Sequence, residues 1–128
     1  MKYRNASHPE VGPFNYAELK VVLGTKNLEL REPVVYDDGT IYFGEWEKDK
    51  KCGRGVQVWT DYSIYEGCWK NDKAEGKGRI IHADGDVYEG NWKEDKADGF
   101  GLYKHFDGSR YEGSWKEDKQ NGKGNGYF

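Results

Sequence analysis

The chain has little of what most compact folds depend on. It holds two cysteines and three prolines among 128 residues. Cys52 and Cys68 are too few for a disulfide framework, and we expect both to be reduced and without a functional role. No apolar run approaches the length of a membrane span, and no signal peptide opens the chain, so we expect a cytoplasmic protein.

The sequence also has no cluster of charges of one sign. Lys and Arg number 20 and Asp and Glu number 23, a formal net charge of -3, and the two signs are interleaved. Because a nucleic-acid-binding protein needs a basic patch to neutralise phosphates, we predict no nucleic-acid partner. A hydrophobic content of 35% is low for a globular core, yet aromatic residues reach 16%, and disordered chains are poor in them.

The marks of a catalytic or cofactor-binding site are absent from the pattern. His8, His82 and His105 do not combine with the cysteines at metal-ligand spacing. The paired glycines lack the Lys-Ser/Thr that follows a phosphate-binding loop, and no nucleophile pairs with a base. We therefore expect no catalytic residues, no metal and no cofactor, and we interpret the chain as not an enzyme.

What the chain does have is an aromatic and glycine pattern that returns every 23 residues, four times. Each unit reads Tyr-x-Gly-x-Trp, a polar turn and Gly-x-Gly. The aromatic members are Tyr42, Trp46, Tyr65, Trp69, Tyr88, Trp92, Tyr111 and Trp115. The glycine members are Gly44, Gly53, Gly55, Gly67, Gly76, Gly78, Gly90, Gly99, Gly101, Gly113, Gly122 and Gly124. A fixed period of this length predicts a repeat array in which each unit contacts mainly its neighbours.

Within a unit the alternation is that of a strand. Tyr65, Gly67 and Trp69 fall on one face, and the residues between them fall on the other. A recurrent Asp-Lys pair marks a first turn and Asp-Gly marks a second, so each unit is predicted to be a hairpin in an antiparallel meander. One unit carries Asp61-Tyr62 in place of Asp-Gly, and we expect that turn to be looser.

The glycines have a physical reason in this arrangement. A first turn centred on residues 71–72 would place Gly67 opposite Gly76 and Glu66 opposite Lys77. Glycine beside tyrosine leaves a gap in which an aromatic ring can lie flat on the sheet. With two strands per unit at about 4.8 Å, four units would span roughly 40 Å.

These residues resemble the MORN repeat (membrane occupation and recognition nexus). The resemblance covers about residues 34–128, with Asp-Lys in every turn where the family often has Gly-Lys. It implies an all-β, elongated, single-layer antiparallel sheet. Similar proteins serve as scaffolds on cytoskeletal and ciliary structures, as junctional membrane tethers, and as accessory modules on lipid kinases and a histone methyltransferase. In several of them the aromatic groove receives a partner peptide.

The aromatic members have two readings. Their rings either stabilise the sheet by stacking on glycine, or also anchor a partner segment in an aromatic groove. We expect a non-catalytic protein-protein interaction scaffold, part of a larger complex, in a cytoskeletal or ciliary (axonemal) assembly. The alternatives are a phospholipid-binding tether and the targeting module of a larger enzyme such as a lipid kinase. The turn lysines that a lipid would meet are Lys50, Lys73, Lys96 and Lys119, each preceded by an aspartate that offsets its charge.

We divide the chain into an N-terminal extension, residues 1–33, and a repeat array, residues 34–128. The extension is expected to be mostly irregular, and it either caps the open edge of the first hairpin or contacts a partner. The fourth unit stops partway along its return strand, so two readings stay open: a chain of four units, or a piece of a longer array.

Overall fold

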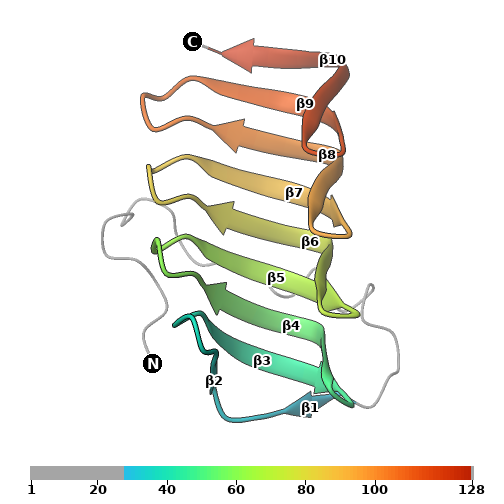
Figure 1. Ribbon diagram of the computed structural model, residues 1–128. Coiled ribbons are helices and arrows are strands. Elements are labelled where there is room, and N and C mark those ends of the chain that lie inside the picture. The colour runs from blue at the N-terminus through green and yellow to red at the C-terminus, as the bar shows by residue number, and fades with distance from the viewer. Residues whose placement is uncertain (1–27, 128) are drawn as a thin grey trace.

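The computed structural model describes residues 28–127, and side chains as far as residue 121. Within this part the chain forms one antiparallel sheet without a helix, as predicted (Figure 1). The strands are β1 (Glu29–Leu30), β2 (Val34–Val35), β3 (Ile41–Glu47), β4 (Lys50–Val58), β5 (Ile64–Lys70), β6 (Lys73–Ile81), β7 (Val87–Lys93), β8 (Lys96–Lys104), β9 (Arg110–Lys116) and β10 (Lys119–Tyr127). From β3 to β10 each strand pairs with the next in the chain, which gives a single-layer meander of consecutive hairpins.

The polar turns are two-residue hairpins. Lys70 pairs with Lys73 across residues 71–72, as predicted. Asn71 and Asp72 both have positive φ, 51° and 70°, and the corresponding residues of the next two units repeat these values closely. Two central residues with positive φ define the tight turn whose twist matches that of the flanking strands, and Asn and Asp tolerate this conformation best. We call these four turns the tips.

The predicted strand register was wrong by two residues. Gly67 pairs with Gly78 instead of Gly76, and Glu66 pairs with Arg79 instead of Lys77. The cause is a bulge between Gly67 and Trp69, where the facing strand inserts extra residues and Gly76 takes a φ of 90°. The same irregularity recurs in every unit. It bends the long strands near the tips (Figure 1), because bulges increase local twist.

The second set of turns lies at the other end of the strands. In each, an aspartate side chain accepts a hydrogen bond from the backbone two residues later, as Asp61 does from Ser63 N at 2.9 Å. Tyr62 takes the place of glycine at one turn, with a φ of 73°. Its N–H donates to Trp59 O at 2.9 Å, equal to the bond that Gly39 makes with Tyr36. The expectation of a looser turn there was therefore wrong.

The core of this single layer is the face that carries the aromatic rings. Tyr42, Tyr65 and Tyr88 are almost fully buried, at 0%, 1% and 2% exposure. The tryptophans of the pattern are buried as well, although no second layer of described residues covers them. Rings that lie down on the sheet and against one another supply this burial, at about 150–250 Å² for each ring.

The opposite face of the sheet also buries side chains near its centre. Val56, Ile64 and Ile81 are buried there, and so is an ion pair between Glu66 and Arg79. Arg79 Nη2 donates to Glu66 Oε1 at 2.8 Å. Opposite charges on directly paired residues are the arrangement that stabilises neighbouring strands.

The first hairpin has its outer edge partly covered. Glu29 and Leu30 of β1 pair with Trp46 and Glu45, and β2 pairs with the other end of β3. β1, from the N-terminal extension, and β2, at the start of the array, therefore supply partners to an otherwise open strand edge. Residues 1–27, to which the predicted cap or partner-binding role also applies, lie outside the described residues.

Candidate functional site: an aromatic groove on one face of the sheet

The aromatic rings form a continuous ladder along the sheet. Tyr65 meets Trp69 of its own unit and Trp92 of the next, with ring centroids 5.0 and 5.2 Å apart and interplanar angles of 82° and 86°. Edge-to-face contacts of this kind stabilise beyond the area that they bury. The same contacts recur from Tyr42 to Trp115, so all eight predicted aromatic residues lie on one face.

Polar atoms of the rings bond to the backbone beneath. The Oη of Tyr65 donates to Cys68 O at 2.9 Å, and the indole Nε1 of Trp69 donates to Gly55 O at 3.1 Å. Trp92 and Trp115 repeat the indole bond one and two units later. These bonds fix ring orientation as well as satisfying buried polar groups.

The predicted glycines separate into three positions. A Cβ on Gly78 would stand 2.1 Å from the Oη of Tyr65, and Gly55 and Gly101 are covered in the same way by Tyr42 and Tyr88. Gly44, Gly67 and Gly90 abut the backbone of the paired strand, while Gly53, Gly76 and Gly99 take positive φ at the bulge. Gly113 pairs with both Gly101 and Gly124. The side-chain environments of Gly122 and Gly124 lie outside the described part.

Because the rings are buried, a partner would meet the groove above them. We call this the ring-face groove. One described stretch of this groove has a volume of about 290 Å³. The lining residues are Ile80, His82, Tyr88, Trp92, Asp95, Ala97, Tyr103, Trp115 and Asp118. Small-molecule and side-chain sites are of this kind, concave and mostly apolar with a few polar groups.

The tips form one side of the groove, and their aspartates make hydrogen bonds that connect one unit to the next. Asp95 Oδ1 accepts a hydrogen bond from Ala74 N at 2.8 Å, and Asp95 N donates to Ala74 O at 3.0 Å. Asp118 makes the same two bonds with Ala97. The Asp-Lys pair of the repeat therefore has a structural role that the sequence pattern alone did not reveal.

The other side of the groove is set by the second turns. The Oη of Tyr103 donates to Asp86 Oδ2 at 2.8 Å, and His105 Nδ1 lies 3.2 Å from the same oxygen. Burial acts to raise the pKa of Asp86, but the hydrogen bonds from Tyr103 Oη and Phe106 N, together with nearby His105, hold it below its ordinary value. Burial and the bond to Asp86 raise the pKa of Tyr103.

In the first unit one side chain of the protein itself occupies the groove. Lys51 extends over the rings, with Nζ 4.5 Å from the ring centroid of Trp69 and 5.5 Å from that of Tyr42. It donates to Gln57 Oε1 at 2.7 Å. Burial lowers the pKa of Lys51, and the charges of Asp72 and Asp95 act against that effect. Aromatic faces attract a cation in this position.

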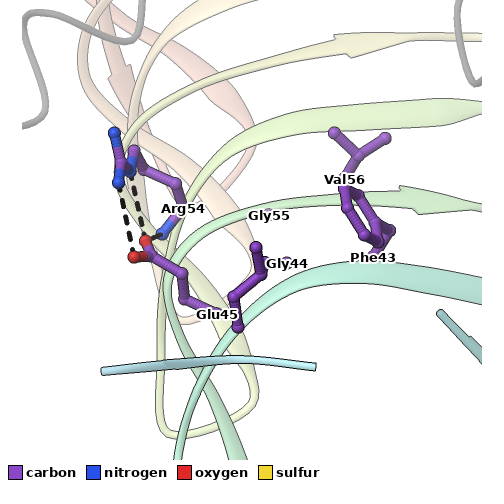
Figure 2. Close-up of a pocket in the computed structure, with 7 residues that line it drawn as sticks. Phe43, Gly44, Glu45, Arg54, Gly55 and Val56 are labelled. Atoms are coloured by element: carbon purple, nitrogen blue, oxygen red, sulfur yellow. Dashed lines mark hydrogen bonds and ion pairs between the residues drawn. The ribbon is translucent and has the colours of Figure 1, made fainter. Parts of the chain in front are cut away.

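The opposite face carries a second, shallower hollow beside the first hairpin. It is lined by Leu30, Phe43, Val56 and the ion pair between Glu45 and Arg54, with a volume of about 290 Å³. Figure 2 shows Phe43 and Val56 side by side at one end of the hollow and the ion pair at the other. Arg54 Nε lies 3.1 Å from Glu45 Oε1.

No three His, Cys, Asp or Glu side chains gather as metal ligands within residues 28–127. Cys52 and Cys68 are free and buried, and burial raises the pKa of the Cys68 thiol to about 11. That shift makes the Cys68 thiol a poor nucleophile near neutral pH. No helix of the described part is long and apolar enough to cross a membrane.

Sequence reasoning found the rings but missed the residues that shape the groove. The tip aspartates recur in every unit and alanine recurs at positions 74 and 97, so their signal was present in the repeat, whereas Tyr103 occupies a position at which the other units carry Gln57, Ile80 and Gly126. Lys51 could have been found in the same way, because the later units carry Ala74, Ala97 and Gln120 at its position.

Comparison with known proteins agrees with this geometry. A search of curated proteins gave no significant match to the chain. The MORN repeat matches at residues 42–64, 65–87, 88–110 and 111–125, four consecutive units that cover more than half of the sequence. MORN repeats mark repeat proteins that often take part in binding, to membranes or to other proteins. The chain belongs to the MORN repeat family.

Proposed function

We propose that the chain is a non-catalytic protein-protein interaction scaffold whose ring-face groove receives an extended or helical segment of a partner. The observation that carries the proposal is the groove itself, a mostly apolar hollow above the aromatic rings with polar groups on both sides. Rigid aromatic residues supply large contact area at low entropic cost, which is why they dominate binding hot spots.

The charge pattern favours a protein over a membrane as the partner. The tip lysines are exposed, but an aspartate precedes each of them, and the tips carry no cluster of uncompensated positive charge. Anionic lipids attract such clusters. On the groove side, Asp95 and Asp118 add negative charge, which favours a partner segment that carries positive side chains.

The setting of this scaffold is proposed on family resemblance alone. Scaffolds of this kind serve cytoskeletal and ciliary structures, and we propose the same for this chain. Imaging of the tagged protein against microtubule and axonemal markers checks the setting, and a uniform distribution through the cell would count against it.

The test of the scaffold compares two matched ring deletions. Tyr103→Ala removes a ring that lines the groove, while Phe100→Ala removes a half-exposed ring from a strand position that faces away from the groove. Both variants are checked for folding by circular dichroism and then used to capture partners from cells, with quantitative mass spectrometry. Partners of the groove should fall at least several-fold with Tyr103→Ala and stay with Phe100→Ala. Equal capture by wild type and folded Tyr103→Ala would refute the groove as the binding surface.

A further inference from the structure

The clue to what the groove accepts comes from comparing units of the same chain. In the first unit Lys51 lies in the groove, over the rings of Tyr42 and Trp69 and bonded to Gln57. One and two units later the same position holds Ala74 and Ala97. Alanine ends at Cβ, so these units lack the cation that the first unit supplies from within.

The surroundings of Lys51 are repeated around Ala97. Tyr88 and Trp115 lie two units after Tyr42 and Trp69 and occupy the same positions of the repeat. The ladder contact that joins each pair of rings is kept, at 5.4 Å in the first pair and 5.2 Å in the second. Asp72, whose carboxylate accepts from Lys51 N, corresponds to Asp118, which accepts from Ala97 N.

Two of the groups around Lys51 Nζ differ, and an aromatic ring takes the place of the amide acceptor that Gln57 supplies. Gln57 is replaced by Tyr103, whose ring stacks on Trp115 with centroids 5.9 Å apart and an angle of 30°. Tyr36, which lies 5.8 Å from Lys51 Nζ, is replaced by His82, whose ring lies 6.2 Å from that of Tyr103. The site over Ala97 thus gains the ring of Tyr103, which also covers part of the Trp115 ring, while Asp118 remains beside it.

The space over Ala97 is open and bears negative charge. The stretch of groove between Tyr88, Tyr103 and Trp115 has a volume of about 290 Å³, and Asp95 and Asp118 line it. Aromatic faces with a carboxylate nearby attract an ammonium group, more strongly where water is excluded. An acidic partner group would meet like charge in the same place.

We propose that the site over Ala97, formed by Tyr88, Tyr103, Trp115 and Asp118, binds the alkylammonium group of a lysine side chain carried by a partner protein. Lys51 shows within the same molecule how such a side chain lies over the corresponding rings of Tyr42 and Trp69. The inference rests on the proposed scaffold function and gives the partner segment a defined chemical feature, a lysine that enters between the tips and the second turns.

The test uses the intact chain and a probe that needs no knowledge of the partner. Nα-acetyl-lysine methylamide is titrated at constant ionic strength while the indole N–H signals of the tryptophans are followed by NMR. We expect saturable shifts at Trp115 and none at Trp69, because Lys51 already lies over Trp69. Nα-acetyl-norleucine methylamide, which lacks the charge, should bind about tenfold more weakly.

Exchanging lysine and alanine at positions 51 and 97 provides the matched variants. Ala97→Lys should close the site by placing a lysine where the first unit has one, and the probe should then no longer shift Trp115. Lys51→Ala should open the equivalent site, so that Trp69 begins to respond. Thermal unfolding of both variants verifies that they fold. If Ala97→Lys proves unstable, Tyr103→Leu removes one wall of the site and should weaken the probe several-fold.

Three results would overturn the assignment: no saturable shift at Trp115, equal binding of the norleucine and lysine derivatives, or tighter binding of Nα-acetyl-arginine methylamide than of the lysine derivative. Failure of the probe is separable from failure of the scaffold. Partner capture that depends on Tyr103 but is unaffected by Ala97→Lys would leave the scaffold standing without this subsite. A probe that binds the Ala97 site while capture is insensitive to Tyr103→Ala would keep the subsite and remove the scaffold.

Discussion

The tip aspartates provide the sharpest test of how the units are held together. Asp95 Oδ1 accepts the N–H of Ala74, a residue that is only 3% exposed, across a distance of 2.8 Å. Replacing Asp95 with alanine removes that acceptor and leaves a buried N–H without it. A hydrogen bond to a charged group contributes about 1.5–3 kcal/mol, and an orphaned buried donor costs a comparable amount.

The conformation of the turn adds a smaller contribution. Asp95 has a φ of 71°, which aspartate tolerates better than alanine does. We therefore expect Asp95→Ala to lower the free energy of unfolding by about 2–4 kcal/mol. Asp95→Asn keeps an acceptor oxygen and the turn preference, and should cost only about 1 kcal/mol because it loses the charge. Asp95→Gly, which suits the turn but lacks the acceptor, should fall between the two.

The assay is urea unfolding followed by circular dichroism, with hydrogen exchange of the Ala74 amide as a local readout. Glu94→Ala is the matched control, because Glu94 lies in the same tip with a φ of 48° and the Ala74 N–H donates to Asp95 and not to the exposed side chain of Glu94. The Ala74 amide should exchange faster in Asp95→Ala and stay protected in Asp95→Asn. Equal destabilisation by Asp95→Ala and Glu94→Ala, or unchanged exchange at Ala74, would refute the reasoning.

Three further outcomes follow from the same structure. Tyr62→Gly should raise the free energy of unfolding by about 0.5–1 kcal/mol in thermal unfolding, because an exposed tyrosine now holds a left-handed φ of 73°; a lower melting temperature would contradict this. The native Cys68 thiol, followed by peptide mass spectrometry in the unaltered chain, should react with iodoacetamide at least about 100-fold more slowly at pH 8 than the denatured thiol, because burial, with a smaller contribution from Cys52, raises its pKa from 9.0 to about 11; the rate should rise as pH approaches 11, and a fast reaction at pH 8 would show the site to be open. The chain should not float with phosphoinositide liposomes at physiological salt, since the tips carry no uncompensated basic cluster; flotation that Lys73→Glu and Lys96→Glu abolish would establish the membrane alternative.

Much of the fold followed from the period of the sequence, because the same residues recur where the same contacts recur. Tyr65, Gly67 and Trp69 predicted one face of a strand, and the tip at residues 71–72 was placed correctly. The strand register was missed because a bulge absorbs residues without changing the period. Gly76 was read as a ladder residue, while it turns the chain with a φ of 90°.

The candidate site was only half predictable. The aromatic residues were found, but the near-complete burial of all of them except Tyr111 was not, since it depends on rings of neighbouring units packing against one another. The groove is shaped by Tyr103, Ala97 and the tip aspartates, whose roles arise from contacts across about 20 residues of sequence. Lys51 stands where the next two units carry alanine, and its position over the aromatic rings is evident only in the structure.

The most direct test of the account is a double-mutant cycle on Tyr65 and Gly78, since the whole ribbon depends on rings that lie over backbone without side chains. A Cβ on Gly78 would stand 2.1 Å from the Oη of Tyr65 and 2.5 Å from its Cζ. Gly78→Ala should therefore cost about 3 kcal/mol, but less than about 0.5 kcal/mol in a Tyr65→Leu background, where the ring is gone. The pair Gly101 and Tyr88 has the same geometry and serves if Tyr65→Leu does not fold. Additive effects of the two changes in urea unfolding would contradict the central claim, because the glycine would then be required for a reason unrelated to the ring.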